Sequence, residues 1–195
     1  MKYETPVEDT VTAMDEHILD SEKAAQLEDK TRCRIVSQEE LLGAIGDGDT
    51  VIDIGSGTGF FTDDMAIRAE KVYAVDFQEG MHEFYREKGV PENVELVLSR
   101  AAQIEIEHAD VIVSILSLHE IDLEKALATF QKVLGPDGRL IVIDWSQNAE
   151  TDDIPPREKL YTAASAAEAV SEFFEVLEAE ERYNTFKLVA KAKQQ

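Results

Sequence analysis

The sequence predicts an α/β fold: a doubly wound, mostly parallel sheet of seven strands with helices on both faces and an antiparallel C-terminal strand. Short β-branched runs alternate with helix-like stretches between residues 50 and 145, an order typical of parallel strands joined by crossover helices. A glycine-rich turn at residues 55–59 separates the first strand-like run from the helix that follows it. Beyond residue 145, a helix precedes two strand-like runs that indicate a closing pair.

The first 45 residues are predicted to form two helical segments ahead of the sheet. Ser37, followed three residues later by Glu40, resembles a capping box at the start of the second segment. Residues 46–49 (Gly-Asp-Gly-Asp) then indicate a turn. The apolar positions with helical spacing are Val11, Met14, Ile18, Leu19, Leu41, Leu42 and Ile45.

The predicted strands cover residues 50–54, 71–75, 94–98, 111–115, 139–144, 174–179 and 186–191. The helices among them cover residues 59–69, 81–87, 123–134 and 163–174. A chain of 195 residues is long enough to bury one core. We therefore expect one domain over residues 1–195, in which residues 1–45 form a helical cap segment and residues 46–195 form the α/β core.

Composition excludes several classes of protein. Apolar residues make up 44% of the chain and aromatic residues 7%, an ordinary globular balance. The apolar runs fall far short of the roughly 20 residues that span a bilayer, and the first residues lack the pattern of a secretion signal. Cys33 is the single cysteine, and no His/Cys spacing indicates a zinc site. These features predict a cytoplasmic protein with no bound metal and no membrane partner.

The net charge of −22, from 41 acidic and 19 basic residues, is unusual. One interpretation is a basic partner or a cationic substrate. We favour the other, adaptation to the salt-rich cytoplasm of a halophile, because the acidic residues are spread along the whole chain. In both cases the charge disfavours binding to the phosphate backbone of DNA or RNA.

The strongest local signal is the loop Asp53-Ile54-Gly55-Ser56-Gly57-Thr58-Gly59-Phe60, between a predicted strand and a predicted helix. Its glycines let a ligand approach the main chain closely. A dinucleotide-binding loop would have glycine at position 60, and an ATP-binding loop would end in Gly-Lys-Ser/Thr. Neither pattern is present, so the loop indicates another nucleoside ligand.

Two acidic residues narrow the choice of ligand. Asp53, two residues before the first glycine, would repel a pyrophosphate but not a ligand with an ammonium group. Asp76 ends the second predicted strand, where two carboxylate oxygens can accept both hydroxyls of a ribose. The alternatives are a solvated acid at a strand end for Asp53 and a helix cap for Asp76.

Through these motifs, residues 35–192 resemble the class I S-adenosylmethionine-dependent methyltransferases of the small single-domain type. The resemblance implies that Asp53 supports the loop and the methionine ammonium, that Asp76 binds the ribose, and that Phe77 packs on the adenine. The loop residues that would bind this cofactor are Asp53, Gly55, Ser56, Gly57, Thr58 and Gly59.

Two later motifs match the family in part. Arg100 stands where the family usually has an acid that binds the adenine amino group, and arginine has no acceptor for that contact. Adenine recognition would then depend on the Ala101 backbone, with Arg100 stacked on the ring. The fourth-strand motif supplies Ser114 to the cofactor site and keeps the first histidine of a common pair, His119. Glu120 replaces the second histidine.

The implied reaction is methyl transfer to a small-molecule acceptor by in-line displacement. His119 is the candidate base, or else it packs beneath its loop. Asp144 and Trp145 either line the acceptor pocket or end the fifth strand. Arg32 and Arg34 either grip an anionic acceptor or pair with surface acids.

Two alternatives to a small-molecule enzyme remain at this stage. One is methylation of a protein or of RNA. The other is a binding protein that has the cofactor fold without transfer chemistry.

Overall fold

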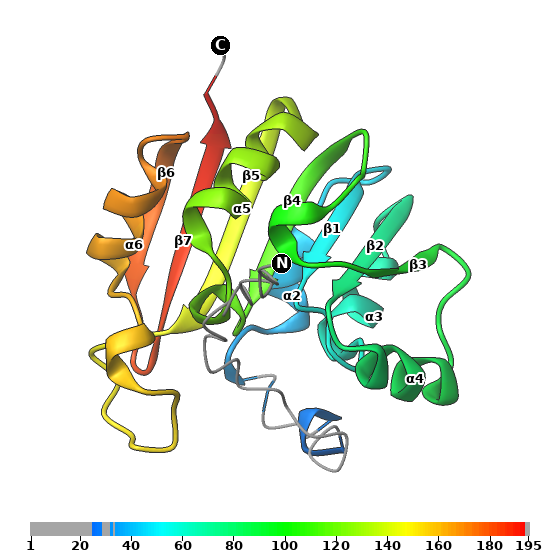
Figure 1. Ribbon diagram of the computed structural model, residues 1–195, viewed down its shortest axis with the longest axis horizontal. Coiled ribbons are helices and arrows are strands. Elements are labelled where there is room, and N and C mark those ends of the chain that lie inside the picture. The colour runs from blue at the N-terminus through cyan, green and yellow to red at the C-terminus, as the bar shows by residue number, and fades with distance from the viewer. Residues whose placement is uncertain (1–24, 29–31, 33, 194–195) are drawn as a thin grey trace, which may run out of the picture.

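The computed structural model describes residues 25–28, 32 and 34–193. Seven strands form one sheet in the order β3-β2-β1-β4-β5-β7-β6 (Figure 1). The strands β1 to β5 pair in parallel, and β7 runs antiparallel to both of its neighbours, β5 and β6. Their bounds are β1 Thr50–Ile54, β2 Lys71–Asp76, β3 Val94–Leu98, β4 Ala109–Ile115, β5 Leu134–Trp145, β6 Phe174–Glu181 and β7 Thr185–Ala192. The predicted doubly wound sheet is therefore confirmed.

Helices cover both faces of this sheet. In Figure 1, α5 and α6 lie in front of the strands, and α2 and α3 lie behind them. The α-helices are α2 Gln38–Ala44, α3 Phe60–Ala66, α4 Glu79–Lys88, α5 Leu123–Val133 and α6 Ala163–Val170. Short 3-10 turns are η1 Ala25–Glu28, η3 Ala101–Gln103, η4 Leu118–Glu120 and η5 Arg157–Lys159.

Two apolar clusters, one on each face, bury the strands. Ile52 of β1 packs in the front cluster with Phe130 of α5, whereas Val51 packs in the rear cluster with Leu41 of α2 and Met65 of α3. Successive side chains of a strand point to opposite faces, so β1 needs apolar residues at consecutive positions. Each fully buried large apolar side chain contributes roughly 1.5–3 kcal/mol. The sheet is thus held from both sides at the strand that carries the glycine loop.

Some predicted boundaries differ from the structure. The fifth strand, predicted over residues 139–144, begins earlier, at Leu134, because Leu134 pairs with Ala109 and the ladder resumes at Arg139 opposite Val111 after an irregularity. The predicted helix 163–174 ends at Val170, and β6 begins at Phe174. The first predicted helical segment, with residues 11–19, and Cys33 lie outside the described residues.

The predicted capping box is confirmed in one half. The Ser37 hydroxyl accepts a hydrogen bond from the Glu40 backbone N–H at 3.1 Å. The Glu40 carboxylate instead forms ion pairs with Arg182 and, at 3.6 Å, with Lys187. These contacts tie α2 to β7 and the turn before it, so the side chain serves tertiary packing and not the helix end.

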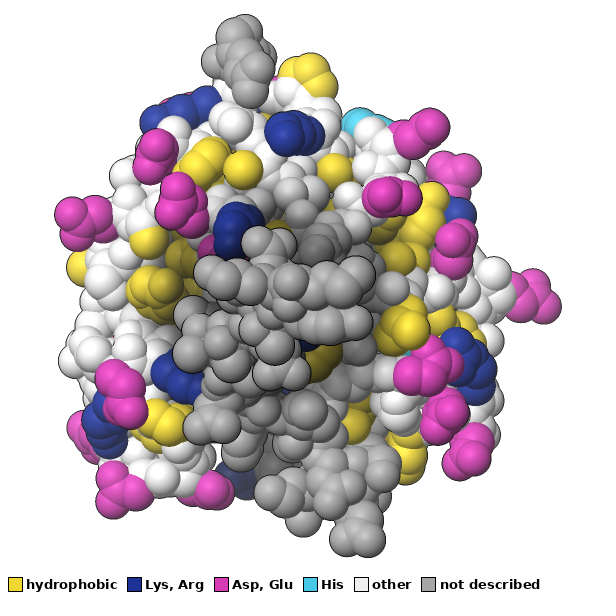
Figure 2. All heavy atoms as spheres, viewed as in Figure 1, with side chains coloured by type: hydrophobic (Ala, Val, Ile, Leu, Met, Phe, Trp, Pro, Cys, Tyr) yellow, Lys and Arg dark blue, Asp and Glu magenta, His cyan; other side chains and the backbone are white. Residues whose placement is uncertain are grey.

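Acidic side chains are distributed widely over the surface. Figure 2 shows them around the visible face, with lysine and arginine side chains between them. Among the described residues, no helix is both long and apolar enough to cross a membrane.

His82 of α4 is fully buried, and neither ring nitrogen has a hydrogen-bond partner among the described residues. Burial lowers the pKa of His82, against the opposing charge of Asp76. A buried polar group without a partner costs about 1–3 kcal/mol. We therefore expect His82→Leu to raise the free energy of unfolding by about 1 kcal/mol in urea denaturation at pH 7. A clear loss of stability in this variant would show that the ring makes a polar contact in solution.

Candidate functional site

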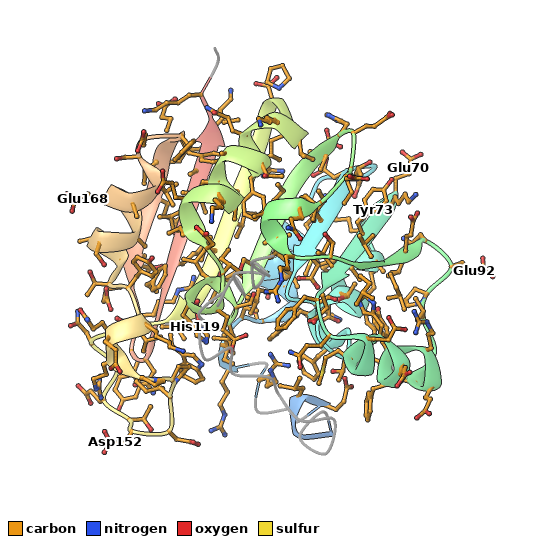
Figure 3. The ribbon with its side chains drawn as sticks, viewed as in Figure 1. Glu70, Tyr73, Glu92, His119, Asp152 and Glu168 are labelled. Carbon is orange, nitrogen blue, oxygen red and sulfur yellow. The ribbon has the colours of Figure 1, made fainter. Side chains whose placement is uncertain are left out.

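The predicted site residues gather at the carboxyl ends of β1, β2, β4 and β5. This edge lies toward the bottom of Figure 3, where His119 follows β4, whereas Glu70, just before β2, lies at the top. Since the carboxyl ends of parallel strands share one edge, residues far apart in the sequence meet here. Open α/β sheets bind their ligands in this position.

The glycine loop makes a sharp turn between β1 and α3. Gly55, Gly57 and Gly59 have φ values of 72°, 55° and 81°, which L side chains rarely adopt. The N–H groups of Gly55 and Ser56 donate to the Val75 carbonyl of β2 at 2.8 and 3.0 Å. The loop is therefore fixed to the neighbouring strand by main-chain hydrogen bonds.

Asp53 lies beneath the loop and is 3% exposed. The Thr62 hydroxyl of α3 donates to its carboxylate at 2.6 Å. Burial raises the pKa of Asp53 to about 7, although the Thr62 hydrogen bond opposes this shift. This hydrogen bond joins the end of β1 to α3 across the loop.

Asp76 connects the end of β2 to the loop. One carboxylate oxygen accepts from the Gly57 N–H and the other from the Gln78 N–H, both at 2.9 Å. Burial raises the pKa of Asp76, against these backbone hydrogen bonds. Each oxygen keeps a second acceptor position, so the carboxylate can still bind hydroxyl groups.

Phe77 and Arg100 meet beside Asp76. The Arg100 guanidinium carbon lies 5.0 Å from the centre of the Phe77 ring, a cation–π contact. Ala101 begins η3 next to them and is buried. The structure thus brings together the three residues predicted for the adenine end.

Ser114 reaches the loop through a second serine that sequence reasoning missed. The Ser114 and Ser117 hydroxyls lie 3.0 Å apart, and Ser117 donates to the Ile54 carbonyl at 2.7 Å. A Cβ added at Gly55 would lie 2.5 Å from the Ser117 Cβ. Ser114 is fully buried below this contact, so it supports the site from within.

His119 forms a buried pair with Asp144. Its Nδ1 lies 2.9 and 3.0 Å from the two carboxylate oxygens of Asp144, and its backbone N–H donates to the same group at 3.0 Å. The His119 side chain is 5% exposed and that of Asp144 is 1% exposed. His119 lies in η4, after β4, and Asp144 lies near the end of β5. Each was named from the sequence, but their pairing was not predicted.

The segment before α2 also contacts the loop. Glu28 of η1 accepts from the Thr58 hydroxyl at 2.6 Å and pairs with Lys88 of α4 at 3.3 Å. Arg32 donates to the Leu27 carbonyl and lies 4.8 Å from the Phe61 ring centre. Neither alternative predicted for Arg32 describes this stacking, and the contact of Glu28 was not predicted.

A hollow elsewhere on the surface lacks the predicted site residues. A hollow of about 680 Å³ lies on the sheet near β3, between Lys71, Tyr73, Glu95 and His108. It contains neither the glycine loop nor Asp76 nor His119. In the part of the chain that the structure describes, no group of three His, Cys, Asp or Glu side chains could hold a metal ion.

Most of these residues lie in a stretch of the chain that is similar to known proteins. A model for a methyltransferase domain matches residues 52–142, which include the loop, Asp76 and His119. A crystal structure of an S-adenosylmethionine-dependent methyltransferase from Aquifex aeolicus is 28% identical, with a TM-score of 0.80 over 90% of this chain and 100% of that one.

Curated relatives match over shorter stretches. The ubiquinone/menaquinone biosynthesis C-methyltransferase UbiE of Escherichia fergusonii is 35% identical over 60% of this chain and 49% of its own length. A probable ribosomal RNA small subunit methyltransferase A of Pyrococcus furiosus is 32% identical over 43% of this chain and 34% of its own. The chain thus spans half or less of these relatives. Residues 52–142 are thus similar to a methyltransferase domain, and the fold of the chain is similar to that of a solved S-adenosylmethionine-dependent methyltransferase.

Proposed function

We propose that this chain transfers the methyl group of S-adenosylmethionine to a small-molecule acceptor by in-line displacement. The observation that carries the proposal is the meeting, at one sheet edge, of a three-glycine loop, the carboxylate of Asp76 and the His119–Asp144 pair. The first two suit a nucleoside with an amino-acid tail, and the third suits proton transfer beside it.

The residues present fit this methyl donor. The Ser56 hydroxyl in the loop is buried and has no hydrogen-bond partner among the described residues. A ligand lying over the loop would supply one. Asp76 has free acceptor positions for the two ribose hydroxyls. The backbone of Ala101 and the ring of Phe77 would hold the adenine, and Gly55 and Gly57 would lie beneath the methionine.

Asp53 would act from behind the loop. Its carboxylate is nearly half charged at neutral pH, given a pKa of about 7. A cationic ammonium above the loop would favour the charged form. S-adenosylmethionine supplies an electrophilic methyl group, and positioning an acceptor in line with it can lower the barrier by about 7 kcal/mol or more.

We also propose that His119 is the base that accepts a proton from the acceptor. Its place after β4, beside the glycine loop, supports this role, and imidazole is the side chain best suited to proton transfer near pH 7. Trp145, which follows Asp144 and is partly buried, would line the acceptor pocket.

The small-molecule acceptor is supported by the name of the first curated relative, a C-methyltransferase of ubiquinone and menaquinone biosynthesis. A match to a ribosomal RNA methyltransferase favours RNA as the alternative acceptor. The charge of −22 counts against RNA, because phosphates would be repelled from an acidic surface.

Thermal unfolding with ligands tests this function. S-adenosylmethionine and its demethylated product, each at 100 times its dissociation constant, should add about 2.7 kcal/mol of stability. NAD should give no shift. A shift with NAD alone would overturn the proposal. A shift with the methionine derivatives but no transfer to any acceptor would indicate a binding protein.

Asp76→Ala should weaken binding of S-adenosylmethionine by about 100-fold or more, because it removes charged hydrogen bonds to the ribose worth about 1.5–3 kcal/mol each. Isothermal titration calorimetry measures the affinity. Asp137→Ala is the matched control, since Asp137 is an exposed acid paired with Lys191. Equal affinities in the two variants would place the adenosine elsewhere.

We further propose that residues 1–195 act as one cytoplasmic domain whose first 45 residues cover the methyl donor. The contacts of Leu27 and Glu28 with the glycine loop support this cover.

The acidic surface would suit a salt-rich cytoplasm. Salt shortens the Debye length from about 10 Å at 0.1 M to about 3 Å at 1 M and so weakens the mutual repulsion of the carboxylates. The unfolding temperature should therefore rise when KCl is raised over this range, and a constant or falling temperature would contradict the idea.

A further inference from the structure

We propose that Asp144 and Glu120 are positioning residues that hold His119 ready to deprotonate an acceptor with an acidic hydroxyl group, a phenol or an enol. This inference rests on the proposed function, in which His119 is the base. It adds the tautomer of His119, the role of its two neighbours, and the chemical class of the acceptor.

Asp144 sets the tautomer. Both of its oxygens lie within 3.0 Å of His119 Nδ1, and one also accepts the His119 backbone N–H at 3.0 Å. A carboxylate is an acceptor only, so Nδ1 carries the proton. The other ring nitrogen, Nε2, is then left with its lone pair, which is the form that a base requires.

Glu120 lies on the side of Nε2. Its Oε1 is 3.7 Å from that nitrogen, too far for a hydrogen bond but close enough for charge attraction. Once Nε2 takes a proton, the imidazolium lies between two carboxylates. Glu120 therefore stabilises the product of proton transfer.

The charged and titratable groups around the pair come from three elements. Asp144 belongs to β5 and Glu120 to η4, while Lys159 of η5 opposes them and Tyr161 lies close to Asp144. Burial by itself lowers the pKa of His119, but the hydrogen bond and charge of Asp144, with the charge of Glu120, raise it above its ordinary value. The base is thus stronger than a free imidazole.

The loop after β4 brings this base to the glycine loop. Ser117, two residues before His119, donates to the Ile54 carbonyl at 2.7 Å and closely approaches Gly55. Leu116 has a φ of 56°, unusual for a residue with a branched side chain, and marks the sharp bend that allows this approach. His119 is therefore fixed to the place where the methionine end would lie.

The chemistry of the pair indicates the acceptor. A strengthened imidazole takes a proton more readily from a phenol or an enol than from an aliphatic alcohol, because the alcohol is far less acidic. Asp53, Glu120 and Asp144 disfavour an acceptor that arrives as an anion. A neutral hydroxyl compound meets both conditions.

In the methyl transfer, one bond to the methyl carbon forms as another breaks. The acceptor's O–H proton moves to Nε2, and the electron pair released on the acceptor forms the new bond to the methyl carbon. The carbon–sulfur bond breaks, and its electrons remain on sulfur. This electron pair can attack from the oxygen or, through the conjugated system, from carbon. In the second case the C–H proton of the methylated carbon then moves to the oxygen and restores the hydroxyl group.

Nuclear magnetic resonance of labelled histidine rings tests the pair without any ligand. The chain has four histidines, and His119→Gln identifies the His119 signal. His119 should show the Nδ1–H form when neutral and should titrate at higher pH than an ordinary histidine. Asp144→Asn should shift its midpoint down and mix the tautomers, and Glu120→Gln should shift the midpoint alone.

A second histidine–aspartate pair, on the surface, provides the control. His108 Nε2 lies 3.2 Å from Asp110 on the surface, and Asp110→Asn should leave the His119 signal unchanged. A His119 signal that is Nε2–H in the unmodified protein, or that does not respond to Asp144→Asn, would overturn the positioning roles. If Asp144→Asn does not fold, Glu120→Gln, which alters a more exposed side chain, decides by the same signal.

Transfer assays test the acceptor class. With S-adenosylmethionine, hydroquinone should be methylated, on oxygen or on carbon as mass spectrometry distinguishes, and aniline and benzoate should not. Asp144→Asn should lower kcat by about 100-fold and move the acidic limb of its pH profile to lower pH, with little change in donor affinity. Methylation of aniline or benzoate in place of hydroquinone would overturn the class. The ligand-dependent unfolding described above would then still support a methyltransferase.

Discussion

Gly59→Ala is expected to prevent folding or to destabilise the protein by more than about 3 kcal/mol. Gly59 has a φ of 81°, and a Cβ there would lie 2.1–2.5 Å from three atoms of the Tyr85 ring. Tyr85 is fully buried, and its hydroxyl donates to Asp63 at 2.6 Å, so the ring has little room to move. Urea denaturation followed by circular dichroism measures the effect.

Gly48→Ala is the matched control for this variant. Gly48 has a similar φ of 87°, but no atom lies within 4 Å of a Cβ added there. The Gly48→Ala variant should therefore lose only about 1–2 kcal/mol of stability, because alanine is disfavoured at this positive φ. If both variants are equally stable, contact with Tyr85 is not what requires glycine at position 59.

Asp53→Asn is expected to stabilise the protein at pH 8 and to leave its stability unchanged at pH 4. The folded-state pKa of Asp53 is about 7, above its ordinary value of 3.8. A raised pKa means that the folded protein binds the proton more tightly than the unfolded chain. The contribution of Asp53 to the free energy of unfolding is therefore fully present below pH 3.8. It is lost as the pH rises through 7, and the free energy of unfolding then falls by up to about 4 kcal/mol.

Asparagine is a neutral acceptor that keeps the hydrogen bond from Thr62. The variant should thus be about 2–4 kcal/mol more stable than the unmodified protein at pH 8. Denaturation curves at several pH values measure the difference. Asp137→Asn, at an exposed acid, should not reproduce it, and a variant that is less stable at pH 8 would show that the charged carboxylate supports the fold.

The strands were predictable where local pattern and burial agree. β1 and β3 begin and end at the predicted residues, since β-branched and leucine residues predominate in each of these short runs. The start of β5 was not predictable. Gly135 and Gly138 indicate a turn locally, and only pairing of Leu134 with Ala109 places these residues in the sheet.

The candidate site was predictable in its parts but not in its contacts. Local spacing identified the loop and Asp76, and the resemblance of the fourth-strand motif identified His119. His119 and Asp144 are 25 residues apart in the sequence, and they meet because β4 and β5 lie side by side in the sheet. Glu28 lies 30 residues from Thr58, and nothing in the neighbouring residues signals their hydrogen bond.

The antiparallel strand β7 has a consequence for how the chain is made. β6 pairs with β7 and not with β5, so it leaves the ribosome before its neighbour exists. Arg139 of β5 pairs with Lys191 of β7, so this edge of β5 also stays uncovered until β7 has been synthesised. One flank of the sheet stays open during synthesis until residues 185–192 emerge, and a nascent chain stalled before them would expose two strand edges to other chains.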